Sequence, residues 1–295
     1  MATIGFIGLG PMGLPMAQNL IKAGQELKGM EIDTVQKDKF IAGGGTIAAT
    51  VKEAASDVDV VITMLPDLQH VRAIYLSPNG VIANARKGAL LIDCSTIDVE
   101  SARTIAAAAE RQGLHVVDAP TSGGVGAAVV RKLTFMVGGP FGAFMRAKAI
   151  LSWMGQSVVH AGPAGNGQAA KICNNMILGV SMIAVSEAFI LAEKLGLDAQ
   201  KMFDIASRSS GQCWSMTSYC PVPGPVPASP ANNNYKPGFT AAMMLRDLGL
   251  AQDAAKRAGA NTPLGADAFK IYSQYVDSGE ANRDFSGIIQ HVRGA

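Results

Sequence analysis

The chain has 295 residues, of which 48% are hydrophobic and 16% are charged, and its formal net charge is +2. This length and composition indicate two folded domains with a large buried core rather than a disordered chain. The small net charge provides no electrostatic basis for binding nucleic acid or an anionic membrane. The four cysteines form no C-x-x-C pair and lie near no cluster of histidines, so we expect no metal site and a reducing, cytoplasmic location.

A short apolar run, Thr3–Ile7, leads into a G-x-G-x-x-G motif and then into a predicted helix over residues 11–23. A strand before the motif and a helix after it form the first unit of a dinucleotide-binding fold. The first glycine would permit a tight turn, the second would let a pyrophosphate approach the backbone, and the third would let helix and strand pack closely. The helix N-terminus would offer N–H groups to the phosphates. We therefore expect NAD to contact Gly8, Leu9, Gly10, Pro11, Met12 and Gly13.

Strands and helices alternate through the first half of the chain. The further predicted strands are continuous apolar runs, which is typical of parallel strands covered by helices on both faces. Predicted helices lie between them, for example over 99–112 and 141–154. The pattern predicts an α/β fold, a Rossmann-type doubly wound domain over residues 1–163. Its remaining predicted strands cover 58–64, 89–94, 114–117, 133–137 and 157–160.

Helical patterns alone follow Pro163, which predicts an all-α second domain over residues 164–295 that begins with a long interdomain helix. This first helix, over 166–195, is apolar enough to resemble a membrane span, but Glu187 interrupts it, and we expect a buried core helix. Gly196 is expected to end it, and Asp198 to cap the next helix. Further helices are predicted over 198–207, 241–258 and 264–278, with a proline-rich loop over 219–238.

The strand that should follow the first helix is poorly marked, because Gly29 lies inside its apolar run. A dinucleotide-binding fold carries an acidic residue about 20 positions after the glycines, where it binds the ribose hydroxyls. Glu31 occupies this place, and Asp33 is close enough to compete with it. We favour Glu31. Because no arginine follows directly to receive a 2′-phosphate, we expect NAD rather than NADP.

Lys171 and Asn175 are four residues apart at the start of the long apolar helix, so they share one face of it. A lysine at an apolar helix can simply extend its ammonium group to solvent. Here, however, the preceding dinucleotide-binding domain would place Lys171 near the cleft where a nicotinamide binds. A lysine in such a place can exchange a proton with a hydroxyl or carbonyl oxygen while a hydride moves.

Two segments at predicted strand ends also fit a ligand cleft. Residues 118–124 follow an apolar strand and offer the Ser122 hydroxyl and glycine N–H groups, which can bind a carboxylate. An ordinary strand–loop turn would explain this segment equally well. Residues 93–96 end another strand, on the side where open α/β sheets bind ligands.

Taken together, these segments resemble the β-hydroxyacid dehydrogenase family over essentially the whole chain. The resemblance rests on residues 6–13, 118–124, 165–175 and 246–251. It implies that Lys171 is the general acid/base and that Asn175 holds the substrate beside it. The other implied contacts are, for the substrate, Ser122, Gly123, Gly124 and Asn174, and, for NAD, Leu65, Pro66, Thr96 and Arg246.

Within the family, residues 211–215, 219–224 and 233–235 are similar to enzymes that act on 3-hydroxyisobutyrate. Trp214 would then form an apolar wall for the methyl group of the substrate, although packing in a core would also explain a tryptophan there. The implied reaction is NAD-dependent oxidation of 3-hydroxyisobutyrate to methylmalonate semialdehyde, a step of valine catabolism. Related acids, such as tartronate semialdehyde, serine and 3-hydroxypropionate, remain alternatives, as does a non-catalytic dinucleotide-binding protein.

The chain departs from the family pattern at several positions. Arg246 replaces a usual lysine and keeps the charge, but its planar fork differs from an ammonium group. Arg131 replaces a usual turn glycine, so the hairpin expected over 129–133 could differ from that of the family. Thr121, Cys220 and Glu31 replace a usual valine, asparagine and aspartate. None of these changes removes the candidate lysine.

The expected partners are a small hydroxy acid and further copies of the chain. The long apolar helix suggests subunit contacts, and the resemblance implies a homodimer or homotetramer. No basic segment precedes the first strand, so we expect no signal peptide and a cytoplasmic protein.

Overall fold

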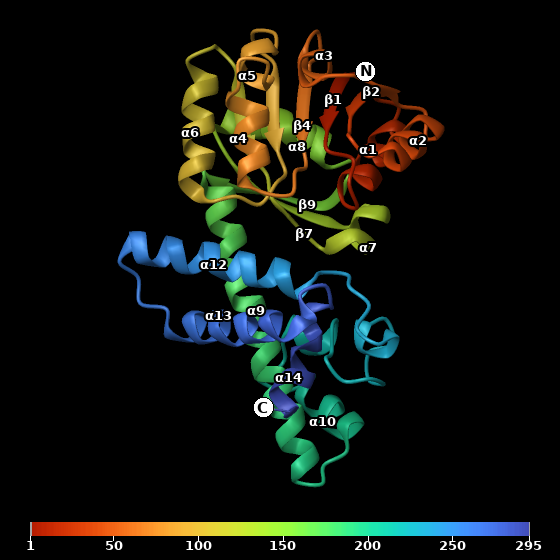
Figure 1. The fold of residues 1–295 in the computed structure, drawn as a ribbon, viewed down its shortest axis with the longest axis vertical. Coiled ribbons are helices and arrows are strands. Elements are labelled where there is room, and N and C mark those ends of the chain that lie inside the picture. Colours follow the sequence, from red (N-terminus) through yellow and green to blue (C-terminus); the bar gives the residue numbers. More distant parts are fainter. Residues whose placement is uncertain (1, 295) are drawn as a thin grey trace. The chain divides into compact units, whose positions relative to one another are not determined.

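The computed structural model of the chain describes residues 2–294, which divide between Lys171 and Ile172 into two compact units (Figure 1). We call the first the sheet unit and the second the helical unit. Helix α9 (Asn166–Lys194) begins in the sheet unit. Its first residues belong there because Asp118 accepts hydrogen bonds from the backbone around its N-terminus. The division therefore falls later in the chain than residue 163, where the sequence pattern changes.

The sheet unit is built on one nine-stranded sheet with the order β3-β2-β1-β4-β5-β6-β8-β7, in which β9 also pairs with β8. Strands β1 to β6 run parallel to one another, β8 is antiparallel to β6 and β7, and β9 is parallel to β8. This confirms the Rossmann-type, mostly parallel sheet. The strands are β1 (Thr3–Ile7), β2 (Glu26–Met30), β3 (Thr46–Ile47), β4 (Val60–Thr63), β5 (Leu90–Asp93), β6 (His115–Asp118), β7 (Thr121–Ser122), β8 (Leu133–Gly138) and β9 (Gly155–Gly162).

Helices cover both faces of this sheet, as its continuous apolar strands predict. In β4, the side chains of Val60 and Ile62 join one hydrophobic core, and Val61 joins the other, because successive residues of a strand point to opposite faces. The first core includes helices α1 (Gly13–Lys22), α2 (Thr34–Ala42), α7 (Gly124–Val129) and α8 (Phe141–Leu151). The second includes α3 (Val51–Ala55), α4 (Leu68–Leu76), α5 (Val81–Asn84) and α6 (Val99–Glu110).

Two segments differ from the sequence pattern. The run around Gly29 forms strand β2, and a Cβ on Gly29 would lie 2.5 Å from the Phe40 ring, so the glycine makes room for that ring. The hairpin expected over residues 129–133 is wrong. Helix α7 ends at Val129, and a turn with Arg131 in the left-handed region (φ 58°) leads into β8.

The helical unit confirms the predicted change to helices after the sheet. Asp198 caps α10 by accepting from the Lys201 N–H, and Gly196 ends α9 with a φ of 77°. Figure 1 shows α12 and α13 side by side. The helices are α9, α10 (Ala199–Ala206), α11 (Trp214–Thr217), α12 (Ala241–Ala258), α13 (Pro263–Tyr275) and α14 (Ile288–Gly294), with 3₁₀ turns at Pro230–Asn233 and Phe285–Gly287 and a π turn at Val276–Glu280.

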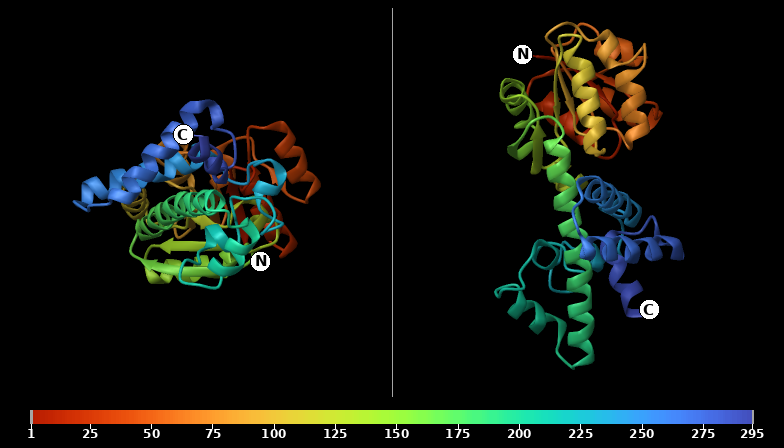
Figure 2. Two further views of the ribbon diagram at one scale, coloured as in Figure 1. Left: turned by 90° about the horizontal axis from the view of Figure 1, so that it is seen from below. Right: turned by 90° about the vertical axis from the view of Figure 1, so that its left-hand side faces the viewer.

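Helix α9 is the central element of the helical unit's core, and Figure 2 shows it as one continuous helix. Met182 and Ile183 pack with α12 and α13, whereas Val185 and Phe189 pack with the segment that follows α11. By length and composition alone α9 could cross a membrane, since its apolar window has a mean hydropathy of 1.8, but 44% of that window is buried in the structure. Packing on two sides is the arrangement expected of a core helix.

Candidate functional site

The glycine motif has a geometry suited to a dinucleotide. Gly8 has a φ of 92°, and a Cβ on it would lie 2.3 Å from the Met64 carbonyl oxygen. A Cβ on Gly13 would lie 1.9 Å from the Gly8 carbonyl oxygen, so this glycine sets the close approach of α1 to the loop. A Cβ on Gly10, by contrast, would meet no atom within 4 Å. The open space beside Gly10 and the N-terminus of α1, which has no acidic residue in its first turn, suit a pyrophosphate.

Glu31, rather than Asp33, faces the glycine motif. Its Oε2 accepts from the Leu9 N–H at 2.7 Å, and its Oε1 accepts from the N–H groups of Ile32 and Asp33. The Asp33 carboxylate instead caps α2, where it accepts from the Gln36 N–H at 3.0 Å. Of the two acids left open by the sequence, Glu31 therefore has the position suited to ribose hydroxyls.

Three further predicted cofactor residues lie at the carboxyl ends of β4 and β5, whereas Arg246 lies on α12 in the helical unit. Leu65 and Pro66 follow β4, and Thr96 follows β5, at the sheet edge where open α/β folds bind ligands. The Leu65 N–H donates to the Ser95 hydroxyl at 2.9 Å, so the two loops are joined. Ser95 is fully buried.

The buried carboxyl group of Asp93 links the end of β4 to the loop after β5. The Oδ1 atom of Asp93 accepts from the Thr63 hydroxyl at 2.8 Å and from the Ser95 N–H at 3.1 Å. Burial raises the pKa of Asp93 to about 6, against the lowering effect of these hydrogen bonds. Its Oδ2 atom is buried and has no hydrogen-bond partner among the described residues.

Lys171 lies against the predicted substrate segment. Only 8% of its surface is exposed, so its ammonium group does not reach solvent freely, and Nζ donates to the Thr121 carbonyl oxygen at 2.7 Å. Ser122 follows directly and ends β7. Gly123 and Gly124 then adopt φ values of 134° and 70°, conformations that favour glycine. The sheet unit thus brings the predicted lysine, a hydroxyl and two glycines together.

The N-terminus of α9 is held by two buried side chains, Asp118 and Gln168, whose roles are not apparent from the sequence. Asp118 accepts from the N–H groups of Gly165 and Gln168 at 2.7 and 2.9 Å. Burial raises the pKa of Asp118, and these N–H donors oppose that effect. An acidic residue at the end of a strand and a glutamine at the start of a helix are too common to single out from the sequence.

In the helical unit, Asn175 and Arg246 are joined by Asp247, a residue whose role sequence reasoning missed. The Asn175 Nδ2 donates to Asp247 Oδ2 at 2.5 Å, and Asp247 Oδ1 accepts from Nε and Nη2 of Arg246. The Asn174 side chain donates to Asn175 Oδ1 at 3.0 Å. Asp247 is buried. Its place next to Arg246, in the motif over residues 246–251, was the one feature of the sequence that could have identified it.

Trp214 lies on the surface of the helical unit rather than in its core, with 50% of its area exposed. Its ring stacks on Tyr219 at 4.9 Å between centroids, and Tyr219 stacks on Phe285. The Tyr219 hydroxyl donates to Asp284 at 2.9 Å. Burial raises the pKa of Tyr219, so the hydroxyl stays protonated as a donor. The tryptophan ring is therefore held by a fixed aromatic partner.

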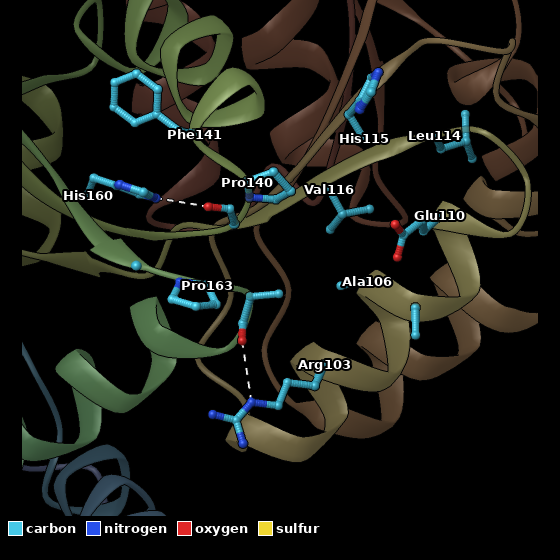
Figure 3. Close-up of a pocket in the computed structure, with 14 residues that line it drawn as sticks. Arg103, Ala106, Glu110, Leu114, His115, Val116, Pro140, Phe141, His160 and Pro163 are labelled. Atoms are coloured by element: carbon cyan, nitrogen blue, oxygen red, sulfur yellow. Dashed lines mark hydrogen bonds between the residues drawn. The ribbon is translucent and has the colours of Figure 1, made fainter.

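A separate pocket of about 540 Å³ in the sheet unit contains none of the predicted site residues. It lies between α6 and the ends of β6 and β9, and Figure 3 shows Arg103, His115 and His160 among the side chains around it. Two of the lining groups are already hydrogen-bonded, since Arg103 donates to the Ala164 carbonyl and His160 pairs with the Gly139 carbonyl. We do not assign this pocket to the site.

Two known sequence families match this chain, one over most of the sheet unit and one over the rest of the chain. A model of the NAD binding domain of 6-phosphogluconate dehydrogenase matches residues 3–162. A model described as the NAD-binding domain of NADP-dependent 3-hydroxyisobutyrate dehydrogenase matches residues 165–292. Together these matches cover both units of the chain.

Curated relatives match over nearly their full length. A protein of Mycobacterium tuberculosis named "Probable 3-hydroxyisobutyrate dehydrogenase" is 48% identical over 293 residues, which is 99% of this chain and 98% of the relative. The NAD-dependent L-serine dehydrogenase of Pseudomonas aeruginosa is 45% identical over 286 residues, 97% of this chain and 96% of the relative. A solved structure of the M. tuberculosis 3-hydroxyisobutyrate dehydrogenase with L-serine has a TM-score of 0.94 and covers 99% of each chain at 48% identity.

Proposed function

This chain belongs to the β-hydroxyacid dehydrogenase family, and we propose that it oxidises 3-hydroxyisobutyrate to methylmalonate semialdehyde with NAD as the hydride acceptor. Family membership makes it an oxidoreductase, which confirms the expected class of enzyme and the NAD cofactor and argues against a non-catalytic nucleotide-binding protein. The choice of substrate and the roles of individual residues are the content of the proposal.

The observation that carries the proposal is the environment of Lys171. Its buried ammonium group donates to the Thr121 carbonyl at 2.7 Å, directly beside the segment that we assign to the substrate carboxylate. The neighbouring Ser122 hydroxyl and the glycine backbone of residues 123–124 supply donors for a carboxylate. A proton-exchanging group and a carboxylate site side by side are what oxidation of a hydroxy acid requires.

In the proposed reaction, the carboxylate of the hydroxy acid binds at Ser122, Gly123 and Gly124. Lys171, in its neutral form, accepts the proton of the substrate hydroxyl as the C–O bond becomes a carbonyl, and in the reverse direction its ammonium group returns that proton. NAD, when bound at Gly8 to Gly13 and Glu31, supplies the hydride acceptor. The chain's own contribution is therefore to bind the carboxylate and to move one proton.

The helical unit contributes further substrate residues in this proposal. Asn175 follows Lys171 by one turn of α9, and we assign it, with Asn174, to the substrate. Arg246 is assigned to the nicotinamide and substrate, and its guanidinium is oriented by Asp247. Trp214 is assigned to the substrate methyl group, which its exposed and stacked ring suits.

L-Serine is the second candidate substrate. One close relative is named an NAD-dependent L-serine dehydrogenase, and the M. tuberculosis structure holds L-serine. Serine shares a carboxylate and a 3-hydroxyl with 3-hydroxyisobutyrate but carries an amino group in place of the methyl group. A methyl group against the half-exposed Trp214 ring removes apolar surface of both groups from water, which is the basis for preferring 3-hydroxyisobutyrate.

Initial rates of NADH formation with 3-hydroxyisobutyrate, L-serine and 3-hydroxypropionate test the proposal. We expect the highest kcat/KM for 3-hydroxyisobutyrate, a preference for NAD over NADP, and at least a 100-fold loss of turnover in Lys171→Ala with NAD binding retained. A higher kcat/KM for L-serine than for 3-hydroxyisobutyrate would show that L-serine is the preferred substrate. Turnover near that of the wild type in Lys171→Ala would overturn the role of the lysine.

We also propose that the protein is a cytoplasmic homodimer or homotetramer that acts in valine catabolism. Large apolar side chains are exposed on the helical unit, including Ile177 and Leu191 of α9 and Ile205 of α10, and burial between copies would remove them from water. Light scattering coupled to size exclusion would give the mass in solution. A monomer at micromolar concentration would contradict the assembly.

A further inference from the structure

Two buried side chains, Asp118 and Gln168, tie the first turn of α9 to the carboxyl ends of β6 and β5. We propose that Asp118 and Gln168 are positioning residues that fix where Lys171 lies, and that Gln168 links the lysine's helix to the cofactor loops. We call Asp118, Gln168 and Ser95 the α9 clamp. The proposal rests on the role proposed above for Lys171, and it adds two residues that touch neither substrate nor NAD.

Asp118 anchors the helix to the end of β6. Its two carboxylate oxygens accept from the N–H groups of Gly165 and Gln168, which are otherwise unpaired at a helix N-terminus. A negative charge at this end of a helix is also favourable. The Asp118 carboxylate therefore fixes the N-terminus of α9 to the end of β6.

Close packing around Asp118 restricts the position of the α9 N-terminus. A Cβ on Gly167 would lie 2.4 Å from the Met136 carbonyl oxygen and 2.6 Å from that of Asp118. A Cβ on Gly138 would lie 2.5 Å from an Asp118 carboxylate oxygen. The same Cβ on Gly138 would lie 2.7 Å from the Gly167 backbone nitrogen, so the start of the helix packs directly on the strand backbones and can shift only if these strands shift.

Gln168 anchors the same turn to the loop after β5. Its Nε2 donates to the Ser95 carbonyl at 2.8 Å, and its Oε1 accepts from the Ile97 N–H at 3.1 Å. The side chain is fully buried, and it satisfies both backbone groups that flank Thr96. Gln168 therefore holds the predicted NAD-binding residue Thr96 between its two hydrogen bonds.

The clamp also reaches the loop after β4, because the Ser95 hydroxyl accepts from the Leu65 N–H at 2.9 Å. A continuous set of buried and partly buried hydrogen bonds thus runs from Leu65 through Ser95 to Gln168, three residues before Lys171. The α-helix between Gln168 and Lys171 is stiff, so a displacement at Gln168 is passed to Lys171. Reacting groups displaced by about 1 Å can lose about 100-fold in rate.

Single-turnover rates of NADH formation at saturating NAD and substrate test the clamp directly, because they report the chemical step. We compare the wild type with Gln168→Met, which keeps the length of the side chain and removes both hydrogen bonds, and with Asp118→Asn. We expect at least a 10-fold lower rate in each. Gln25→Met is the matched control, since Gln25 also accepts from one backbone N–H and donates to one backbone carbonyl in the sheet unit, at the start of β2.

A positioning role predicts that Gln168→Met acts through the lysine. On a Lys171→Ala background, Gln168→Met is then expected to cause less than a twofold further loss, because the group it positions is absent. If Gln168 had only a structural role, Gln168→Met would lower the rate by the same factor in Lys171→Ala as in the wild type. Either that result, or a Gln168→Met rate equal to that of Gln25→Met, would overturn the clamp.

The same variants separate the clamp from the proposed function. If Lys171→Ala alone keeps the wild-type rate, the role of the lysine fails and the clamp fails with it. If Lys171→Ala is slow while Gln168→Met and Asp118→Asn are as fast as the wild type, only the clamp fails. Thermal unfolding of each variant confirms that it is folded at the assay temperature.

Discussion

The Asn175 side chain donates to Asp247 across 2.5 Å, and the same carboxylate accepts two N–H bonds from Arg246. One buried carboxylate thus orients an amide on α9 and a guanidinium on α12. Both of its oxygens are occupied, and a charge buried this deeply is tolerated because it is paired and hydrogen-bonded. The Arg246 that replaces the family's usual lysine forms a two-bond fork with its neighbour, which an ammonium group cannot form.

Substitution of Asp247 is expected to weaken catalysis through both neighbours. Asp247→Ala leaves Asn175 and Arg246 without this acceptor, which we expect to lower kcat/KM by at least 10-fold and the free energy of unfolding by about 1–3 kcal/mol. Asp247→Asn keeps the shape and one acceptor, so its losses should be smaller. Steady-state kinetics and urea unfolding measure both effects. Asp204→Asn, an exposed acid on α10, is the control, and equal losses in the two Asp247 variants would contradict this order.

A methyl group at Gly10 should separate cofactor binding from folding. Because a Cβ there meets no atom within 4 Å, Gly10→Ala should unfold at the wild-type temperature while its Kd for NAD rises by at least 10-fold. Calorimetric titration with NAD and thermal unfolding give the two values. Gly142→Ala, at the start of α8, is matched because its Cβ would also meet no atom. Unchanged NAD affinity in Gly10→Ala would place the pyrophosphate elsewhere.

Glu31 should determine the preference for NAD over NADP. Its carboxylate beside the Leu9 N–H would accept ribose hydroxyls and repel a 2′-phosphate. We expect Glu31→Ala to raise the KM for NAD by about 10-fold and to lower the ratio of NAD to NADP in kcat/KM by at least 10-fold. Asp33→Ala, which removes a helix cap, should cost stability and leave that ratio unchanged. If Asp33→Ala lowered that ratio and Glu31→Ala did not, Asp33 would be the residue that binds the ribose.

The sequence predicts the order of strands and helices well because apolar periodicity and glycine placement are local signals. Strand β1, the glycine motif and helix α12 all follow from residues that are neighbours in the chain. Lys171 could be singled out for a similar reason, since a lysine at an apolar helix beside a nucleotide-binding domain is unusual.

Contacts between distant segments could not be predicted in the same way. Gln168 meets Ser95 across 73 residues, and Asp247 meets Asn175 across 72, so no local pattern marks either residue. Strand β2 was obscured for the same reason, because its Gly29 is explained only by the Phe40 ring from α2. The expected hairpin at Arg131 failed because α7 supplies the turn, and arginine can adopt the left-handed conformation found there.

The buried carboxyl of Asp93 should make stability depend on pH. Its pKa is about 6 in the folded protein and close to 3.8 in the unfolded chain, so the folded form binds the proton more tightly. The free energy of unfolding should therefore fall as pH rises from about 3 to about 7, by about 3 kcal/mol in total from this group. Above about pH 7 the loss is essentially complete, since the carboxyl group is then ionised in both states.

Asp93→Asn tests this dependence, because the amide resembles the protonated acid and its oxygen can still accept from Thr63 and Ser95. We expect the variant to equal the wild type in urea unfolding near pH 4 and to be more stable than it at pH 8, by about 1–3 kcal/mol. Asp253→Asn, on the exposed side of α12, gives the reference for removing a surface carboxylate. A difference between Asp93→Asn and the wild type that stays constant from pH 4 to pH 8 would show that this carboxyl does not titrate differently on unfolding.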